Sequence, residues 1–226
     1  MKTAKMTPRQ KNETFWGWIF IAPTMIGLMV LNIIPIFQTI HQSFYKTGDF
    51  GKGNKFVGLA NYEKVFGDTE VWQALWNTVK YAIIEVPISI VIALVLAVFL
   101  NKKIKGRSAF RTIMFLPMIV APAAVAMVWK WIYNSNFGLI NNVFGTDVNW
   151  ISNPQIAIYS IAVIGIWGVI GYNMVLFIAG LQEVPRDYYE AASLDGASGF
   201  KQFMYITVPL ISPTIFFVLV TRVIAA

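Results

Sequence analysis

Hydrophobic residues are gathered into five long runs that polar stretches separate. The runs cover residues 15–37, 80–100, 110–131, 156–181 and 206–226. A helix needs about 20 mostly apolar residues to cross the hydrocarbon core of a bilayer, and each run is close to this length. The pattern therefore predicts an all-α, polytopic bundle of about five membrane-spanning helices.

The first run follows a basic tail at residues 1–14, an order that secretory signal peptides share. The run is too long for the apolar part of a signal peptide, and no small-residue cleavage site follows it. We therefore expect a retained span. Pro23 and Pro35 should bend this span unless neighbouring groups satisfy the carbonyls that the prolines leave free.

Prolines also divide two later runs. Pro117 and Pro122 lie inside the run 110–131, so we expect this helix to be interrupted. Pro209 and Pro213 fall in the first turns of the last run, where a missing N–H is tolerated. Because five spans leave the two chain ends on opposite sides of the membrane, we expect a sixth span that this sequence does not include.

Composition supports a membrane protein. Of the 226 residues 57% are hydrophobic and 13% are charged, whereas a soluble domain carries about 25% charged residues. A net charge of +7 would raise nucleic acid as a partner of a soluble protein. Here the positive charges flank the apolar runs, so membrane topology explains them and we expect no nucleic acid. Cysteine is absent and His41 is the single histidine, so neither a disulfide nor a metal site is expected.

The distribution of Lys and Arg predicts the orientation of the spans. The tail 1–14 carries four basic residues, including Lys2 and Lys5, and the connection 101–111 carries five basic residues, including Lys103, and no acid. Basic connections stay in the cytoplasm. We therefore place the N-terminus, the connection 101–111 and the polar stretch 182–205 in the cytoplasm. The long connection 38–79 has as many acids as lysines and is expected outside.

The stretch 182–205 is polar and rich in small residues, and it reads as helix, break, helix. Pro185 suits a first helical turn, and Asp187 lies where negative charge favours the helix dipole. Gly196 can end the helix in a left-handed conformation, and a second short helix is expected at about residues 197–205. The residues alone fit a docking segment for a soluble partner and a simple solvated connection equally well.

A family resemblance separates these two interpretations. The motif Glu190-Ala191-Ala192-x-x-Asp195-Gly196-Ala197, followed by Ile206-x-x-Pro209, resembles the cytoplasmic loop of ATP-binding-cassette (ABC) importer permeases. Three further stretches resemble the same family: Ala179–Pro185, Phe56–Tyr62 with the later Asn77-Thr78, and Arg111-x-x-x-Phe115-Leu116-Pro117. The pattern is similar to the carbohydrate-importer branch, which includes the maltose and glycerol-3-phosphate permease subunits.

The resemblance implies a type I ABC importer permease fold and a coupling role for the loop. In that family the loop forms a helix that sits in a groove of the ATPase subunit. Carried over by position, the coupling residues are Glu190, Ala191, Ala192, Asp195, Gly196 and Ala197. The resemblance further implies a prokaryotic cytoplasmic membrane, surrounding membrane lipid, an ABC ATPase dimer, a second and different permease subunit, and an extracytoplasmic solute-binding protein. The cargo is expected to be a sugar or a related solute.

The chain carries no chemistry of its own that the sequence reveals. It lacks the Gly-x-x-x-x-Gly-Lys-Ser/Thr phosphate loop, and Gly51-Lys52-Gly53 is read only as a flexible turn. ATP and Mg are therefore expected on partner subunits, no cofactor is expected here, and the chain is not expected to be an enzyme.

Polar and aromatic residues within the runs are candidates for a substrate pathway. Asn173 is either an interhelical hydrogen-bonding residue or a substrate contact, and the nearby glycines Gly165, Gly168 and Gly171 should permit close helix packing. Trp167 and Tyr172 either stack on a sugar ring or simply pack.

Two charged residues in the runs need an explanation of their own. Glu85 is expected near the outer boundary with a structural role. Arg222 should face protein or water, because a central arginine costs about 2.5 to 3.5 kcal/mol on insertion scales. It then either lines the pathway or extends to the outer interface.

Two other functions stay open from the residues alone. Ion-coupled secondary carriers often show inverted repeats and carboxylates at the membrane midplane. No clear internal repeat is visible here, and Glu85 is the only acid within a run. The other alternative is a non-transporting membrane scaffold that recruits a soluble partner through residues 182–205.

Overall fold

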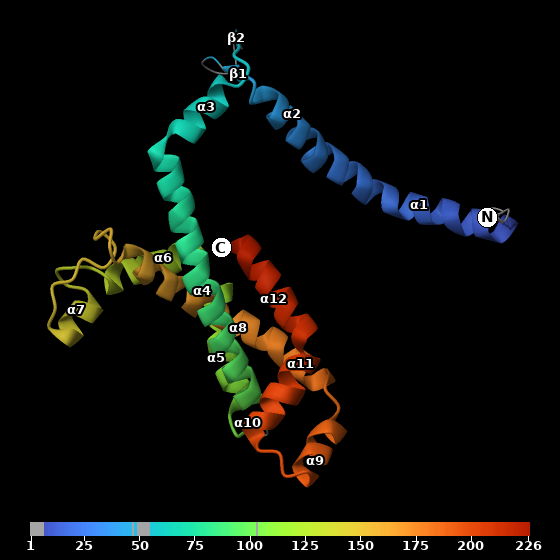
Figure 1. Cartoon of the computed structure of the whole chain (residues 1–226), viewed down its shortest axis with the longest axis vertical. Helices are drawn as coiled ribbons and strands as arrows, with labels where there is room; N and C mark the ends of the chain where they lie inside the picture. Colours follow the sequence, from blue (N-terminus) through green and yellow to red (C-terminus); the bar gives the residue numbers. More distant parts are fainter. Residues whose placement is uncertain (1–6, 47, 49–54, 103) are drawn as a thin grey trace. The chain divides into compact units, whose positions relative to one another are not determined.

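A computed structural model describes residues 7–46, 48, 55–102 and 104–226 (Figure 1). The chain divides into two compact units, residues 1–72 and 73–226, which are described separately. Lys2, Lys5 and Lys103 and the predicted turn at 51–53 lie outside the described residues.

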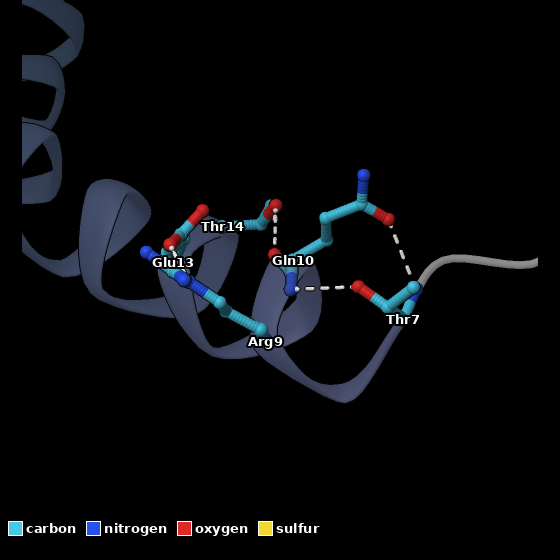
Figure 2. A network of polar contacts seen from close by, with 5 residues as sticks. All are labelled: Thr7, Arg9, Gln10, Glu13 and Thr14. Atoms are coloured by element: carbon cyan, nitrogen blue, oxygen red, sulfur yellow. Dashed lines mark hydrogen bonds and ion pairs between the residues drawn. The ribbon is translucent and has the colours of Figure 1, made fainter.

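The first unit begins with a long apolar helix. Helix α1 (Pro8–Leu28), the π-helical turn η1 (Met29–Ile33) and α2 (Ile34–Gln42) follow one another as a single helix of 35 residues. Thr7 starts α1 with a reciprocal cap, because its hydroxyl accepts from the Gln10 N–H and its own N–H donates to the Gln10 side chain (Figure 2). The predicted span 15–37 is therefore extended at both ends.

The two prolines of this helix lie within it and do not end it. Pro23 is inside α1, and Pro35 stands in the first turn of α2 directly after η1. A π-helical turn widens the helix locally, which accommodates a residue that cannot donate a backbone hydrogen bond. The first span thus stays helical through both prolines.

Much of the predicted connection 38–79 has regular structure. Strands β1 (Tyr45–Lys46) and β2 (Lys55–Phe56) pair antiparallel, α3 (Ala60–Gly67) follows, and α4 (Thr69–Asn101) already begins at Thr69. The Asn61 amide holds this region together by donating to the carbonyls of Ser43 and Tyr45 at 2.8 and 3.1 Å. The second span therefore begins well before residue 80.

The core of the second unit lies between three helices. Val86, Ile90, Ala93 and Ala97 of α4 pack with residues of α8 (Ala157–Glu183) and of α12 (Ser212–Ala225). The α8 and α12 members of this cluster are Met174, Phe177, Ile178, Leu181 and Val218. Helix α8 matches the predicted span 156–181 closely.

The predicted interruption of the third span occurs at Pro122. Helices α5 (Arg107–Ile119) and α6 (Pro122–Ile132) meet at an angle of 98°. Val120 between them is extended, and Ala121 has φ −55° and ψ 127°, outside the helical region that a following proline disfavours. Pro117 lies inside α5 and does not end it. The short helix α7 (Leu139–Phe144) follows α6.

Helix α8 lies very close to the α5 backbone at Gly171. A Cβ atom there would collide with the Met114 carbonyl oxygen, so only glycine fits. Gly165 is also close to a neighbouring side chain, whereas nothing lies within 4 Å of a Cβ at Gly168. The prediction that glycines permit close packing holds for two of the three.

The last predicted span, 206–226, is broken. After α9 (Arg186–Leu194) come α10 (Gly199–Gln202), the π-helical turn η3 (Phe203–Thr207) and α11 (Val208–Leu210). A bend of 68° at Ile211 separates this stretch from α12. By length and composition, three helices can cross a membrane, or up to five if each bent pair forms one span, among the described residues.

Candidate functional site

The polar stretch between α8 and α12 folds as helix, break and helix (Figure 1). Helix α9 begins directly after Pro185 and ends at Leu194, and Gly196 has φ +72°, in the left-handed region. The N–H of Gly196 donates to the Ser193 carbonyl, and the N–H of Ala197 donates to the Ala192 carbonyl. This pair of bonds is the Schellman motif, and it confirms the predicted helix-ending role of Gly196.

The inner side of α9 is tied to the next elements. The hydroxyls of Tyr189 and Thr207 are 2.9 Å apart, which connects α9 to η3. The Gln202 amide donates to the Ser193 hydroxyl and to the Ala197 carbonyl, both at 3.0 Å. These bonds fix α9, the Gly196 turn and α10 relative to one another, so the stretch 186–207 is a structured unit and not a slack connection.

The outer side of α9 and the following turn are open to contact. Glu190, Ala191, Asp195 and Gly196 are exposed, while Ala192 and Ala197 are half-buried. All six residues of the motif therefore lie in one short segment, and the exposed four offer charge and little bulk.

Two apolar side chains on this segment were missed by the sequence reasoning. Leu194 is 90% exposed and Phe200 is 74% exposed. They add exposed apolar surface to a segment that is otherwise mostly polar. The signal was present in the sequence, because both residues interrupt an otherwise polar stretch on either side of Gly196.

The segment also differs in charge from the rest of the chain. Residues 182–205 hold four acids and two bases, in a chain whose net charge is +7. If a protein binds this segment, charge complementarity favours a basic surface on that protein.

The aromatic candidates of α8 lie in different surroundings. The Trp167 ring packs edge to face on Trp129 of α6, with ring centroids 5.5 Å apart. Both tryptophans line an apolar cavity of about 360 Å³ beside α5. A second cavity of about 650 Å³ lies along α6 and also includes Trp129. Tyr172 is half-buried on α8.

Asn173 is completely buried on α8. Neither its amide nitrogen nor its amide oxygen has a hydrogen-bond partner in the part of the chain that the structure describes. The expected interhelical hydrogen bond is therefore not found there. A buried amide without partners is costly, so it marks a position where a further polar group would be favourable.

Arg222 and Glu85 meet, which the sequence reasoning did not predict. The Arg222 Nη2 donates to the Glu85 Oε1 at 2.7 Å. Arg222 thus faces protein, as one of the expectations for it required. No local signal links two residues that are 137 positions apart.

Among the described residues, no group of three or more His, Cys, Asp or Glu side chains has the arrangement of a metal site. His41 packs on the Tyr45 ring, with centroids 4.9 Å apart.

Comparison with known proteins identifies relatives along most of the chain. The trehalose/maltose transport system permease protein MalF of Thermococcus litoralis is 34% identical over 218 residues, which cover 95% of this chain and 74% of that protein. The sn-glycerol-3-phosphate transport system permease protein UgpA of Salmonella typhimurium is 32% identical, over 92% of this chain and 72% of that protein.

A similar fold has been solved by crystallography. A chain of a bacterial alginate ABC transporter, in complex with an alginate pentasaccharide-bound periplasmic protein, superposes with a TM-score of 0.79 at 21% identity. The match covers 93% of this chain and 72% of that chain. The likeness shows that this chain shares the fold of a chain of that ABC transporter, in agreement with the sequence resemblance.

The family model for binding-protein-dependent transport system inner membrane components matches residues 89–226. This range begins inside α4 and includes α9, Gly196 and both bent helix pairs. The chain therefore belongs to the family of binding-protein-dependent transport system inner membrane components.

Proposed function

We propose that this chain is the permease subunit of an ABC importer for a sugar or a related solute, and that α9 couples it to an ATPase dimer. The observation that carries the proposal is the segment 186–207, which is internally fixed yet presents Glu190, Leu194 and Gly196 to the outside. A rigid, exposed segment between two spans can transmit the movement of a bound partner, whereas a slack connection would absorb it.

The mechanism is alternating access. ATP and Mg bind to the partner subunits, whose closure displaces α9, and the helices that follow expose a central cavity to one side of the membrane or to the other. A ligand shifts such an equilibrium only by its differential affinity for the two states. The chain's own residues contribute docking at α9 and the walls of the cavity.

A sugar or polyol phosphate as cargo is supported by the relatives, whose names refer to trehalose, maltose and sn-glycerol-3-phosphate. We propose Trp167, Tyr172 and Asn173 of α8 as pathway residues. The Trp129–Trp167 pair offers an apolar face to a sugar ring, and Asn173 has unused donor and acceptor capacity. Arg222 is less suited to bind cargo, because its Nη2 is engaged by Glu85.

We further propose that the chain pairs with a different permease subunit and receives cargo from an extracytoplasmic solute-binding protein. The name of the family supports the second point. The N-terminus and α9 are assigned to the cytoplasm on the basis of the basic connections.

Reversing one charge on α9 tests the coupling role. The chain is co-expressed with candidate ATPase, second permease and solute-binding subunits and reconstituted in vesicles, and sugar-dependent ATP hydrolysis and uptake are measured. We expect Glu190→Lys to abolish co-purification of the ATPase or its coupling to uptake, because it places a positive charge against a basic groove. Gly196→Pro should do the same by destroying the turn.

Asp147→Lys is the matched control, because Asp147 is an exposed acid in the connection between α7 and α8, outside residues 182–205. It makes the same change in net charge and should leave coupling intact. Normal uptake and normal ATPase retention in both α9 variants would refute the coupling assignment. Uptake that requires a proton gradient and no ATP would identify an ion-coupled carrier instead, and ATPase retention without any uptake would identify a scaffold.

A further inference from the structure

The second unit contains one ion pair that is shielded from water. Glu85 of α4 is 0% exposed, and the Arg222 side chain of α12 is 15% exposed. The other ion pair among the described residues, Arg9–Glu13, is open to solvent at 89% and 62% side-chain exposure (Figure 2). Removing two charges from water is expensive, and the attraction between them often does no more than offset that cost. A contribution to folding stability therefore does not by itself explain why this ion pair is present.

Three helices meet at this pair. Glu85 belongs to α4 and Arg222 to α12, and α8 is close because a Cβ at Gly165 would collide with the Tyr81 hydroxyl and lie 3.4 Å from the Glu85 Cγ. A single hydrogen bond joins the two charged groups. In the described part of the chain, the Glu85 Oε2 and the Arg222 Nε have no partner. The contact therefore depends on the two charges and has no second bond to replace it.

Few residues of α12 are completely buried, although the helix packs on α8, where Thr214 lies against Gly180. Val218 is the one completely buried residue of α12 in the described part of the chain, and many of its other apolar side chains are exposed. Helices that meet over apolar surface can slide past one another, whereas a buried charge pair is satisfied at one register only. Arg222 and Glu85 therefore specify one register of α12 along α4, in addition to the apolar contact at Val218.

Helix α12 also follows the segment 186–207, which contains α9, along the chain. The Tyr189–Thr207 bond joins α9 to η3, and η3 leads through α11 and the bend at Ile211 into α12. A displacement of α9 therefore reaches α12 along the chain. From α12 it reaches α4 at Arg222.

We propose that the Glu85–Arg222 ion pair is the positioning contact that makes α4 and α12 move as one body, so that displacement of α9 is transmitted to the α4–α8 core. The inference rests on the proposed function, because it assumes that a partner moves α9. Glu85 and Arg222 act here as positioning residues, through the helices that carry them.

Removing the two charges together separates coupling from folding. Arg222→Met alone leaves an unpaired buried carboxylate and should assemble poorly. Glu85→Met with Arg222→Met removes both charges, and such replacements are often neutral or stabilising. We expect this double variant to keep its thermal midpoint and its ATPase partner. Solute transported per ATP hydrolysed should fall about fivefold or more, the lower end of usual coupling energies between sites.

Two further variants complete the experiment. Glu85→Arg with Arg222→Glu restores a pair with exchanged charges, and it should recover most of the lost transport per ATP. Arg9→Met with Glu13→Met removes the exposed pair and should change neither the thermal midpoint nor the ratio.

The outcomes of these variants test the positioning role of Glu85 and Arg222. An assembled double-methionine variant with an unchanged ratio overturns the proposal, and so does an assembled charge-exchanged variant whose ratio stays low. Failure of both to assemble overturns it as well, because the pair is then needed for folding. If the unmodified chain shows no solute-stimulated ATP hydrolysis, the proposed function fails instead, whatever the variants do.

Discussion

At the scale of single residues, Gly171 sets how closely α8 approaches α5. A Cβ there would collide with the Met114 carbonyl oxygen and lie 2.8 Å from the Phe115 Cα. Backbone atoms cannot swing away as a flexible side chain does, so the helices must separate. We expect Gly171→Ala to lower the free energy of unfolding by about 1–3 kcal/mol, the usual effect of overpacking. Thermal unfolding of the purified chain in detergent measures this.

Gly168→Ala is the control for that change. Gly168 lies one turn earlier on the same helix, and a Cβ there meets nothing within 4 Å. Because alanine favours helix more than glycine does, this variant should be as stable as the unmodified chain or slightly more so. An equal loss of stability in both variants would contradict the role of the α5–α8 contact.

The sequence predicted most reliably those residues whose conformation depends only on their neighbours in the chain. The role of Gly196 follows from its place after a short helix, because a positive φ is a property of one residue and its neighbours. The Glu85–Arg222 pair depends on how α4 and α12 lie in space, and no feature of either run indicates it. The missing partner of Asn173 was likewise unpredictable, since it depends on what the neighbouring helices present at that level.

At the scale of elements, the bend between α5 and α6 depends on Pro122. A proline disfavours the helical conformation for the residue before it, and Ala121, with ψ 127°, is not helical. Pro122→Ala removes that restriction and a penalty of about 3 kcal/mol against a continuous helix. We expect α5 and α6 to join partly, which changes the cavities that contain Trp129 and reduces uptake. The labelling rate of a cysteine introduced at Val125, which lines both cavities, reports the change.

Pro117→Ala separates the effect of the bend from the loss of a proline. Pro117 lies inside α5, which continues to Ile119, so its replacement should leave the bend unaltered. Because Pro117 also lines both cavities, the labelling rate at Val125→Cys should change, but far less than with Pro122→Ala. The chain has no cysteine of its own, so the introduced thiol is the only one that reacts. If Pro122→Ala leaves the labelling rate unchanged, then packing around α6 and not the proline maintains the bend.

Element boundaries were predicted less well than the elements themselves. Hydropathy follows the part of a helix that meets lipid, so it placed the start of α4 at residue 80 although the helix begins at Thr69. Residues 69–79 mix apolar side chains with polar ones such as Glu70, Gln73 and Asn77, so they continue the helix without continuing the unbroken apolar run. In the last run the apolar pattern continues although the helix does not. The bend of 68° at Ile211 was therefore not predicted.

At the scale of the whole molecule, orientation in the membrane is the prediction on which the coupling role of α9 depends. The basic connection 101–111 and the segment with Leu194 should face the cytoplasm, and the connection that contains Asp147 should face outward. Both Leu194 and Asp147 are exposed, so a cysteine at either position is reachable from its own side of the membrane.

We expect Asp147→Cys to react with a membrane-impermeant thiol reagent in intact cells, and Leu194→Cys to react only after permeabilisation. The unmodified chain, which lacks cysteine, supplies the blank. Labelling of Leu194→Cys in intact cells would place α9 outside, where no ATPase can reach it, and the coupling mechanism would have to be abandoned.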